Sequence, residues 1–291
     1  MTKLSVIIPV FNEIQSLDHF IPEVIEYCGT KQWELIIVND GSTDGTKESL
    51  NNLPFGEHLL ILHHKLNKGY GAALKTGLSA CNTEYAITLD ADGQHNISDI
   101  DKLLEVIDRQ DADLVVGSRR GLKSGSYYRG IGKSLIRYLA KVLMTVPIYD
   151  LNSGMKIYRT ELAKRYLNLV PDTMAFSDIM ALVFINNRNL VLEEPIRVSE
   201  RKHGKSAISI QTAFQTVMEV IHIVILFNPM KIFLPLSLLC FIATGAWGIP
   251  LLLQGRGVSM GSILGIITGM LLFLLGLIAE QLSMIRRNQD H

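Results

Sequence analysis

The chain has 291 residues, enough for one large domain or two small ones, and 48% of them are hydrophobic, a high share for a wholly soluble protein. Its formal net charge is zero, which argues against nucleic acid as the main partner. The three cysteines lie far apart in the sequence, so neither a disulfide framework nor a zinc site is predicted.

The first 120 residues alternate short β-rich runs with amphipathic stretches of helical period. The β-rich runs are LSVII, ELIIVN, LLILHH, YAITL and DLVVG, and the helical patterns lie near 14–28, 44–53, 70–81 and 98–110. This alternation predicts an α/β fold, Rossmann-like, with a mainly parallel sheet and helices on both faces. Ligands of such sheets bind beyond the carboxyl ends of the strands, and that is where PVFNE, NDGSTDGT, NKGYGAA and DADGQH fall.

The first two of these polar clusters carry groups suited to a nucleotide. Asp40 can accept hydrogen bonds from a base or a ribose, and Phe11 can flank a base while Glu13 accepts from its donors. Pro9 fixes the exit of the strand, and Asp44 is interpreted as a helix cap. Each residue also has a structural explanation by itself. Together they predict a nucleotide pocket beside the fourth cluster.

Two carboxylates stand in that fourth cluster. Asp90 and Asp92 point the same way in an extended segment, so they repel each other unless a cation or buried donors offset the repulsion. Mg²⁺ or Mn²⁺ is commonly held by one or two carboxylates together with substrate phosphates, and Gln94 adds a neutral oxygen. A competing interpretation makes Asp92-Gly93 a plain β-turn and Asp90 a helix cap. A metal-diphosphate site is the leading hypothesis.

Two amphipathic segments follow. Residues 131–146, IGKSLIRYLAKVLMTV, place basic side chains at four-residue spacing on one face and apolar side chains on the other. A helix of this kind can lie in a membrane interface or be an ordinary surface helix, and a membrane segment further along favours the interface. Residues 207–229 have the same character and are interpreted as a juxtamembrane helix.

The C-terminal part holds two runs without a charged side chain, 232–253 and 257–279. At about 1.5 Å rise per residue each reaches about 33 Å, enough to cross the hydrocarbon core of a bilayer. The connection QGRG is too short to form a domain. We therefore expect a transmembrane hairpin with the first 230 residues on one side.

The charges beside these runs predict the orientation of the hairpin. Lys231 precedes the first run and Arg286 and Arg287 follow the second, whereas the turn carries only Arg256. Because basic residues favour the cytoplasmic side, the large N-terminal part is expected in the cytoplasm, at the inner membrane if the protein is bacterial.

The ordered motifs VIIPVFNE, IIVNDGSTDGT, NKGYGAALKTGL, LDADGQH, GSRR, DLNSG and RKHGKS resemble those of family 2 glycosyltransferases of GT-A fold. The two-span C-terminus resembles the polyprenyl-phosphate branch, which includes dolichol-phosphate mannose synthases and bacterial undecaprenyl-phosphate glucosyl transferases. The resemblance covers essentially the whole chain, most strongly residues 4–206. It implies a catalytic domain over 1–206, the juxtamembrane helix over 207–229 and the hairpin over 230–287.

The activity implied by the resemblance is transfer of a sugar from a UDP- or GDP-linked donor to a polyprenyl phosphate, with inversion and with Mg²⁺ or Mn²⁺. It places around the nucleotide the residues Pro9, Phe11, Glu13, Asp40, Lys68 and Asp90. The resemblance assigns binding of the ion to Asp90, Asp92 and Gln94, and the catalytic step to Asp90, Asp92 and Arg119. It assigns to the lipid phosphate and the diphosphate the residues Arg119, Arg129, Lys133, Ser134, Arg201 and Lys205.

Two positions depart from the family pattern. Ala207 stands where the loop RKHGKSA is expected to end in lysine, so Lys205, Lys202 or His203 would supply that charge. Asp178 is either a helix cap or a carboxylate of the acceptor site. No general base is required, because a lipid monophosphate with a second pKa near ~6 is already an anionic nucleophile at neutral pH.

Two other functions are weighed against this one. A processive polysaccharide synthase of the same fold is disfavoured, because Trp33 and Trp247 sit in no Q-x-x-R-W segment. A non-catalytic membrane scaffold that retains the fold is disfavoured by the acidic and basic residues still present. The sugar, the choice of UDP or GDP, the undecaprenyl or dolichyl acceptor and homo-oligomerisation stay open.

Overall fold

The computed structural model describes residues 3–289 except 18, 54–55, 57, 120–146, 152, 198–217, 219–220, 222–223 and 226–227. The described residues form two compact units, one up to Met218 and the other from Ile221 onward. The predicted interfacial helix over 131–146 lies outside the described residues, as does most of the segment 207–229.

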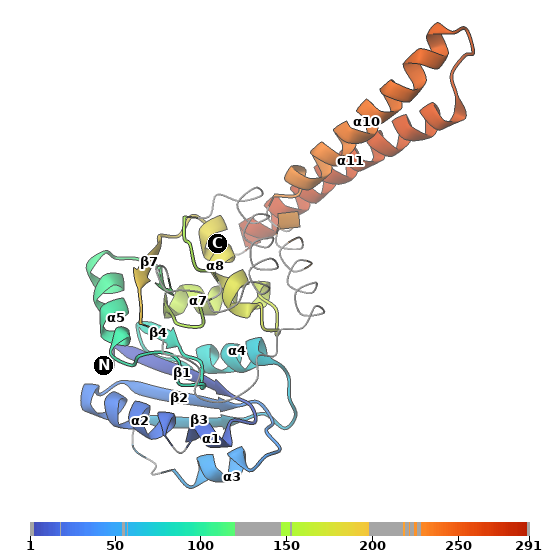
Figure 1. Ribbon diagram of the computed structural model, residues 1–291. Coiled ribbons are helices and arrows are strands. Elements are labelled where there is room, and N and C mark those ends of the chain that lie inside the picture. The colour runs from blue at the N-terminus through green and yellow to red at the C-terminus, as the bar shows by residue number, and fades with distance from the viewer. Residues whose placement is uncertain are drawn as a thin grey trace. The chain divides into compact units, whose positions relative to one another are not determined.

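The first unit is built on one seven-stranded sheet with the order β3-β2-β1-β4-β6-β5-β7 (Figure 1). The strands are β1 Leu4–Val10, β2 Glu34–Asn39, β3 Leu59–His63, β4 Tyr85–Thr88, β5 Leu114–Ser118, β6 Lys156–Arg159 and β7 Val191–Pro195. Strand β6 runs antiparallel to both β4 and β5, and all other neighbours pair in parallel. The mainly parallel α/β fold predicted from the sequence is confirmed.

Helices cover both faces of this sheet. They are α1 Ile14–Leu17, α2 Phe20–Lys31, α3 Thr46–Asn51, α4 Tyr70–Ala80, α5 Asp99–Arg109, α7 Thr160–Tyr166 and α8 Phe176–Asn186, with a short 3₁₀ turn at Leu167–Leu169. Helices α2 and α5 pack on one face, and α4, α7 and α8 lie on the other (Figure 1).

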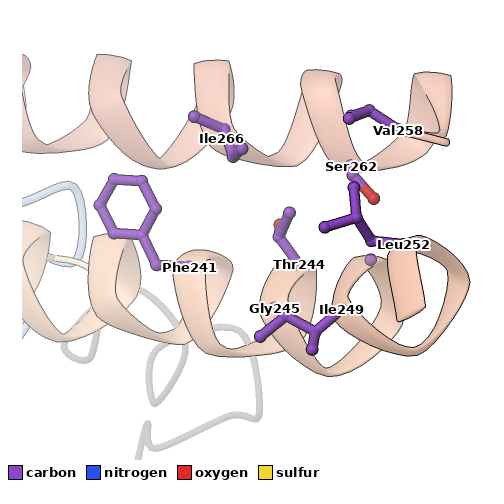
Figure 2. Close-up of a pocket in the computed structure, with 9 residues that line it drawn as sticks. Phe241, Thr244, Gly245, Ile249, Leu252, Val258, Ser262 and Ile266 are labelled. Atoms are coloured by element: carbon purple, nitrogen blue, oxygen red, sulfur yellow. The ribbon is translucent and has the colours of Figure 1, made fainter.

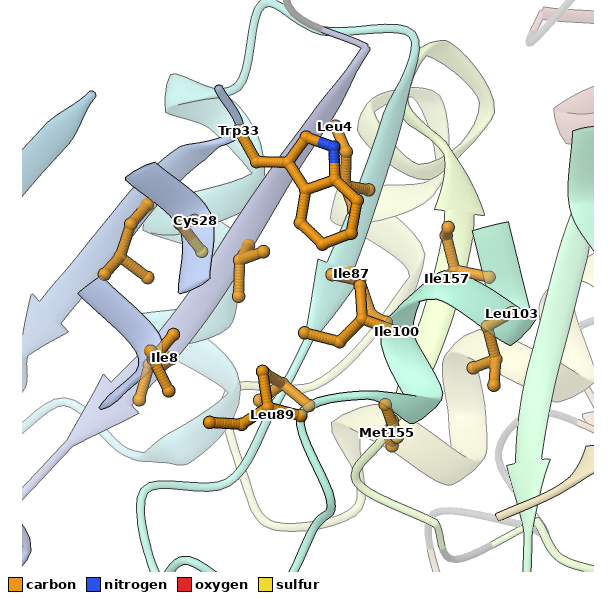
Figure 3. Close-up of a cluster of buried hydrophobic side chains, with 14 of the residues drawn as sticks. Leu4, Ile8, Cys28, Trp33, Ile87, Leu89, Ile100, Leu103, Met155 and Ile157 are labelled. Carbon is orange, nitrogen blue, oxygen red and sulfur yellow. The ribbon is translucent and has the colours of Figure 1, made fainter. Parts of the chain in front are cut away.

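The core explains why the β-rich runs read as nearly continuous apolar stretches. Every residue of β1 is buried, because its alternate side chains face helices on opposite sides of the sheet. Leu4 and Ile8 join Cys28 of α2 and Ile100 of α5 in one cluster (Figure 3). On the opposite face Gly77 lets α4 approach β1, since a Cβ there would lie 2.4 Å from Ile7 Cγ2. Full burial of each large aliphatic side chain contributes about 1.5–3 kcal/mol.

The second unit is a helical hairpin of α10, Met230–Leu253, and α11, Met260–Gln289. Both helices are long and apolar enough to cross a membrane, and only 6% and 17% of their most apolar windows are buried, unlike the core helix of a soluble protein. The apolar run expected to begin at Gly257 becomes helical at Met260. Gly255 and Gly257 have φ of +74° and +75°, and this left-handed backbone forms the turn.

Small residues bring the two hairpin helices together. Ser237 donates a hydrogen bond to the carbonyl oxygen of Gly269 at 2.8 Å, and a Cβ on Gly265 would lie 2.0 Å from Thr244 Oγ1. Closer to the turn a pocket of about 300 Å³ lies along the hairpin (Figure 2). Its lining is mostly apolar and includes Phe241, Thr244, Ile249, Leu252, Ser262 and Ile266. The packing is that of membrane helices, in which small side chains allow close backbone approach.

Candidate active site

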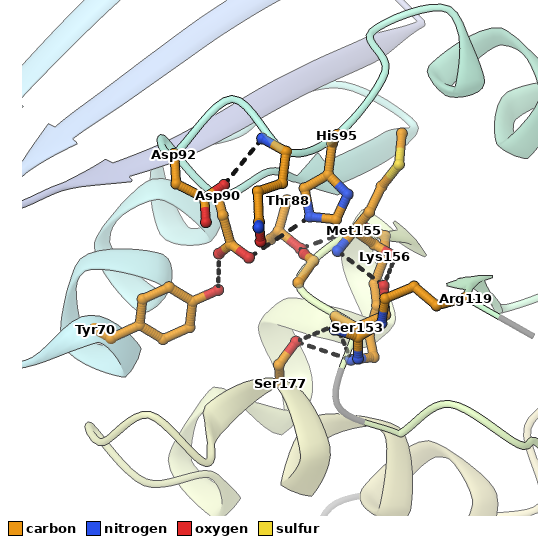
Figure 4. A network of polar contacts seen from close by, with 12 residues as sticks. Tyr70, Thr88, Asp90, Asp92, His95, Arg119, Ser153, Met155, Lys156 and Ser177 are labelled. Atoms are coloured by element: carbon orange, nitrogen blue, oxygen red, sulfur yellow. Dashed lines mark hydrogen bonds and ion pairs between the residues drawn. The ribbon is translucent and has the colours of Figure 1, made fainter. Parts of the chain in front are cut away.

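Asp90 lies just beyond the carboxyl end of β4, where three other segments meet it (Figure 4). The hydroxyl of Tyr70, the first residue of α4, donates a hydrogen bond to Asp90 Oδ1 at 2.8 Å. On the other oxygen, Nε2 of His95 lies 3.6 Å from Asp90 Oδ2. A Cβ on Gly154 would lie only 2.0 Å from the same oxygen, so this backbone forms a wall that only glycine permits. Asp90 is therefore held in one orientation.

The environment of Asp90 keeps the carboxylate ionised. Burial by itself would raise its pKa, but the contact with His95 and its charge, the hydrogen bond from Tyr70 and the charge of Lys156 outweigh burial and lower the pKa. The pKa of the Tyr70 hydroxyl is raised well above its usual value by burial and by the Asp90 charge. Tyr70 is thus a neutral donor to a charged acceptor.

Asp92 forms the turn that follows Asp90. Its Oδ1 accepts a hydrogen bond from the backbone N–H of Gln94 at 3.1 Å, and the intervening Gly93 has φ of +69°. The turn interpretation of Asp92-Gly93 is therefore correct, and it is compatible with a second role for the carboxylate. The competing helix-cap role of Asp90 is wrong, because the next helix, α5, begins only at Asp99.

The donors at this strand end suit Mg²⁺ or Mn²⁺. Among the described residues no three His, Cys, Asp or Glu side chains are grouped as a metal site, so no cage made of these side chains alone stands there. Two carboxylates and the amide of Gln94 provide hard oxygen ligands, and such ions keep other positions for water and substrate phosphates. The residues therefore fit a divalent cation that keeps coordination positions for other oxygen ligands.

Arg119 directly follows β5 and forms a two-pronged ion pair with Asp150. Its Nε and one terminal nitrogen each lie 2.7 Å from a carboxylate oxygen of Asp150, and its backbone N–H donates to the same group at 3.0 Å. Asp150 is itself positioned by Glu193 of β7, whose carboxylate accepts the backbone N–H groups of Tyr149 and Asp150. Burial opposes ionisation of Asp150, but the hydrogen bonds and charge of Arg119 lower its pKa.

A buried cation supports the loop behind Asp90. Lys156, at the start of β6, is fully buried, and its ammonium donates to the carbonyl oxygens of Leu151 and Ser153 and to the hydroxyl of Ser177. Burial lowers the pKa of Lys156, although the charges of Asp178 and Asp150 oppose this shift. The lysine therefore fixes the loop that presses Gly154 against Asp90.

Asp178 belongs to the same polar region. It lies in the first turn of α8, is buried, and acts electrostatically on Tyr70, Arg119 and Lys156. An acidic side chain in the first turn is also favourable to the helix dipole. The helix-cap interpretation is wrong, because the N-cap of α8 is Ala175, and the acceptor-site role of Asp178 stays a prediction.

Asp40, the expected nucleotide ligand, is enclosed by the protein. Its side chain is 4% exposed, and it accepts hydrogen bonds from the backbone N–H groups of Lys68 and Gly69 at 2.9 and 2.8 Å. Nδ1 of His64 lies 2.6 Å from Asp40 Oδ1. Lys68 is an exposed residue, and it contacts Asp40 through its backbone N–H.

The residues expected around the base lie in the loop after β1. Pro9 is buried within β1, Phe11 is 43% exposed and Glu13 is half-buried. Between them, Asn12 accepts a hydrogen bond from the backbone of Thr43, and its own N–H donates to Ser42. This loop is therefore joined to the loop after β2.

Five expected site residues lie outside the described part of the chain: Arg129, Lys133, Ser134, Arg201 and Lys205. Sequence reasoning passed over three others that the structure brings to the site, Tyr70, His95 and Lys156, and it did not pair Asp150 with Arg119. Tyr70 and His95 lie inside polar clusters that the sequence singled out, and Lys156 lies two residues after the motif DLNSG.

A mainly parallel α/β sheet with paired acidic residues beyond a central strand defines a domain of the GT-A type. The profile of Glycosyl transferase family 2 matches residues 5–167, and that of the GtrB C-terminal hairpin matches residues 228–285. The chain belongs to glycosyl transferase family 2, and its two apolar helices together with the hairpin match indicate a membrane protein.

Two curated relatives are similar to this chain over most of its length. One is dodecaprenyl-phosphate galacturonate synthase of Rhizobium johnstonii, 27% identical over 225 residues, which cover 76% of this chain and 66% of the relative. The other is undecaprenyl-phosphate 4-deoxy-4-formamido-L-arabinose transferase of Edwardsiella ictaluri, 31% identical over 207 residues, 70% of this chain and 62% of the relative. The matched part thus spans less than two thirds of either relative.

Solved structures share the fold. Glucosyl-3-phosphoglycerate synthase of Mycobacterium tuberculosis, in complex with Mn²⁺, UDP-glucose and phosphoglyceric acid, has a TM-score of 0.56 at 16% identity, covering 77% of this chain and 80% of that one. TarS residues 1–349 of S. aureus, in complex with UDP, has a TM-score of 0.53 at 20% identity, covering 77% and 66%. At these identities the likeness concerns the fold.

Proposed function

We propose that this protein transfers a sugar from a nucleotide diphosphate sugar to a polyprenyl phosphate at a membrane surface. The observation that carries the proposal is Asp90, held by the hydroxyl of Tyr70 just beyond the carboxyl end of β4 and two residues before Asp92, in a chain that also has two helices long and apolar enough to span a bilayer. The names of the two curated relatives, which act on dodecaprenyl and undecaprenyl phosphate, support the same acceptor class.

The donor would bind across the ends of β1, β2 and β4. Pro9, Phe11 and Glu13 would line the base, with Asp40 and Lys68 shaping the pocket from the neighbouring loop. UDP is the donor nucleotide that the fold neighbours support, since two of them were solved with UDP or UDP-glucose, and a GDP donor is kept as the alternative.

Mg²⁺ or Mn²⁺ would be held by Asp90, Asp92 and Gln94, and when bound it would neutralise charge on the diphosphate. Arg119 would add positive charge from β5. Two of its five N–H donors bind Asp150, and its side chain is 35% exposed, so a phosphate would be bound by the donors that Asp150 does not use. Asp90, Asp92 and Arg119 thus form the proposed catalytic group.

An oxygen of the acceptor phosphate would attack the anomeric carbon of the sugar while the bond from that carbon to the nucleoside diphosphate breaks. The nucleoside diphosphate would leave as an anion, and a single displacement of this kind inverts the anomeric carbon. Because a phosphate monoester with a second pKa near ~6 is largely dianionic at neutral pH, no protein group needs to remove a proton. The chain's task is to bring two anions together and orient them. From the sequence we assign the acceptor phosphate to Arg129, Lys133 and Ser134, and the donor diphosphate to Arg201 and Lys205.

We place the catalytic unit in the cytoplasm, from the basic residues that flank the two apolar runs. A protease added to sealed, right-side-out vesicles should leave the N-terminal domain intact and cut only at the hairpin turn around Arg256. Digestion of the catalytic domain in such vesicles would show that the domain lies on the opposite side of the membrane.

The test of the function offers labelled UDP- and GDP-sugars with a polyprenyl phosphate and Mg²⁺ or Mn²⁺ to the full chain in detergent, followed by extraction into organic solvent. We expect label in the organic phase for at least one donor and none without the metal. Label in a long water-soluble polymer would indicate a processive synthase. Binding of donors with no product from any of them, by folded protein, would indicate a non-catalytic scaffold and overturn the proposal.

A further inference from the structure

Tyr70 reaches Asp90 from a distant part of the sheet. It is the first residue of α4, which follows the edge strand β3, whereas Asp90 follows the central strand β4. Its hydroxyl donates to Asp90 Oδ1 at 2.8 Å across two intervening strands of the sheet order (Figure 4). The hydrogen bond therefore depends on the fold placing the start of α4 over the strand ends.

The backbone on both sides of Tyr70 is fixed. Before it, the N–H groups of Lys68 and Gly69 both donate to the buried carboxylate of Asp40. After it, the N–H groups of Gly71 and Ala72 donate to the carbonyl oxygen of Asp172, at 3.0 and 3.3 Å. Gly69 has φ of +105°, and a Cβ there would lie 2.4 Å from that same carbonyl oxygen. Tyr70 is thus presented from a rigid segment.

The hydrogen bond leaves Asp90 able to bind a cation. A carboxylate oxygen has two lone pairs, and Tyr70 uses one of those on Oδ1. On the far side, Gly154 and His95 limit movement of Oδ2. With both oxygens located, the lone pairs that remain have a fixed direction. A ligand that is oriented before the ion arrives loses less conformational entropy on binding.

We propose that Tyr70 is a positioning residue that orients Asp90 for a divalent cation, and that Asp40 supports it by anchoring the loop that carries Tyr70. This inference rests on the metal site of the proposed function. Asp40 would then have two roles: it would lie beside the nucleotide, and it would hold the backbone of Lys68 and Gly69 that leads to Tyr70. Groups that orient a metal ligand in this way typically change metal affinity about 10–100-fold when they are removed.

The experiment measures Mn²⁺ binding to the full chain in detergent, with UDP present, by the loss of the free-ion electron paramagnetic resonance signal. Four proteins are compared: wild type, Tyr70→Phe, Asp92→Asn and Tyr27→Phe. The last is the matched control, because Tyr27 also donates its hydroxyl to an aspartate, Asp101, at a place away from the site. Near-UV circular dichroism and the thermal unfolding temperature establish that each variant is folded.

We expect Tyr70→Phe to bind Mn²⁺ about 10–100-fold more weakly, and Tyr27→Phe to match the wild type. In turnover assays Tyr70→Phe should need more Mn²⁺ than the wild type for its half-maximal rate, and its rate at saturating Mn²⁺ should equal that of the wild type. Unchanged or tighter Mn²⁺ binding by folded Tyr70→Phe would overturn the positioning role alone. Absence of Mn²⁺ binding by wild type, or undiminished binding by Asp92→Asn, would instead contradict the proposed metal site and with it the proposed function.

Discussion

The guanidinium of Arg119 forms a bidentate ion pair with the carboxylate of Asp150, with two nitrogen–oxygen distances of 2.7 Å. These residues are 31 positions apart, and they bracket the segment 120–146 that carries the acceptor residues proposed from the sequence. Glu193 secures the second of them by accepting the backbone N–H of Asp150 at 2.9 Å. The ion pair therefore ties the residue that follows β5 to the loop that precedes β6.

Breaking this pair should cost stability. Asp150→Asn keeps the shape of the side chain but leaves Arg119 with a partly buried, uncompensated charge, and we expect the free energy of unfolding to fall by about 2 kcal/mol. The estimate is at the low end for buried pairs because Arg119 is 35% exposed. Urea unfolding monitored by circular dichroism measures the change. Asp111→Asn is the control, since Asp111 pairs with Arg159 while 91% exposed, and it should unfold with the wild-type midpoint.

The stabilisation by Asp150 should disappear in acid. Its pKa in the folded protein lies below the ordinary value of 3.8, since the contacts with Arg119 outweigh burial. A lowered pKa adds stability that is fully present above 3.8 and is lost as the pH falls through the folded-state pKa. The difference in unfolding free energy between wild type and Asp150→Asn should thus be constant from pH 7 to 5 and shrink below 3.8. A difference that grew in acid would contradict the assigned direction.

The sheet could be predicted from the sequence because its signals are local. Strands β1 to β5 coincide with apolar runs that are each followed by polar turn residues, and this pattern needs no knowledge of pairing. The position of β6 could not be obtained in this way. It inserts antiparallel between β4 and β5, and nothing in the run from Lys156 to Arg159 indicates those neighbours.

The same distinction applies to the candidate site. Asp90, Asp92 and Gln94 could be grouped because they are close in sequence. The hydrogen bond from Tyr70 to Asp90 spans 20 residues, and that from the Lys68 backbone to Asp40 spans 28. Such contacts are determined by how α4 and the loops pack on the sheet, so periodicity cannot reveal them. The role of Asp40 in fixing a loop became visible only with the fold.

Gly154 should be intolerant of a side chain for a purely steric reason. It lies outside the positive-φ region, so alanine suits its backbone, but the new Cβ would stand 2.0 Å from Asp90 Oδ2. Gly154→Ala should push Asp90 off its position and reduce sugar transfer at least about 100-fold, because small displacements at a reacting centre have effects of that size.

Gly29→Ala provides the comparison for that variant. Gly29 lies in α2 with no atom within 4 Å of an added Cβ, so the substitution should stabilise the helix by about 0.5–1 kcal/mol and leave transfer unchanged. Transfer assays and thermal unfolding distinguish the two cases. Full activity of Gly154→Ala would mean that the backbone beside Asp90 shifts to accommodate the new Cβ, and that Asp90 does not need a single orientation.

Asp92→Asn should abolish transfer and leave the fold intact. The amide oxygen of asparagine can still accept the hydrogen bond from the Gln94 backbone, so the turn is retained while one negative charge is lost from the site. We expect the rate of label transfer to fall to background and the unfolding temperature to stay within about 2 °C of wild type. Asp108→Asn, at an exposed ion pair with Lys3, should retain activity. Near-wild-type transfer by Asp92→Asn would eliminate this carboxylate as a metal ligand.

Close packing within the hairpin predicts a specific pattern of rescue. A Cβ at position 265 would lie 2.0 Å from Thr244 Oγ1, whereas one at 261 would make only ordinary contacts of 3.8 Å or more. Gly265→Ala should therefore lower the unfolding temperature of the hairpin unit in detergent, and Gly261→Ala should not. Replacing Thr244 by alanine in the Gly265→Ala background removes the clashing hydroxyl and should restore much of the loss. If Gly265→Ala were as stable as Gly261→Ala, the two helices would not approach each other at this point.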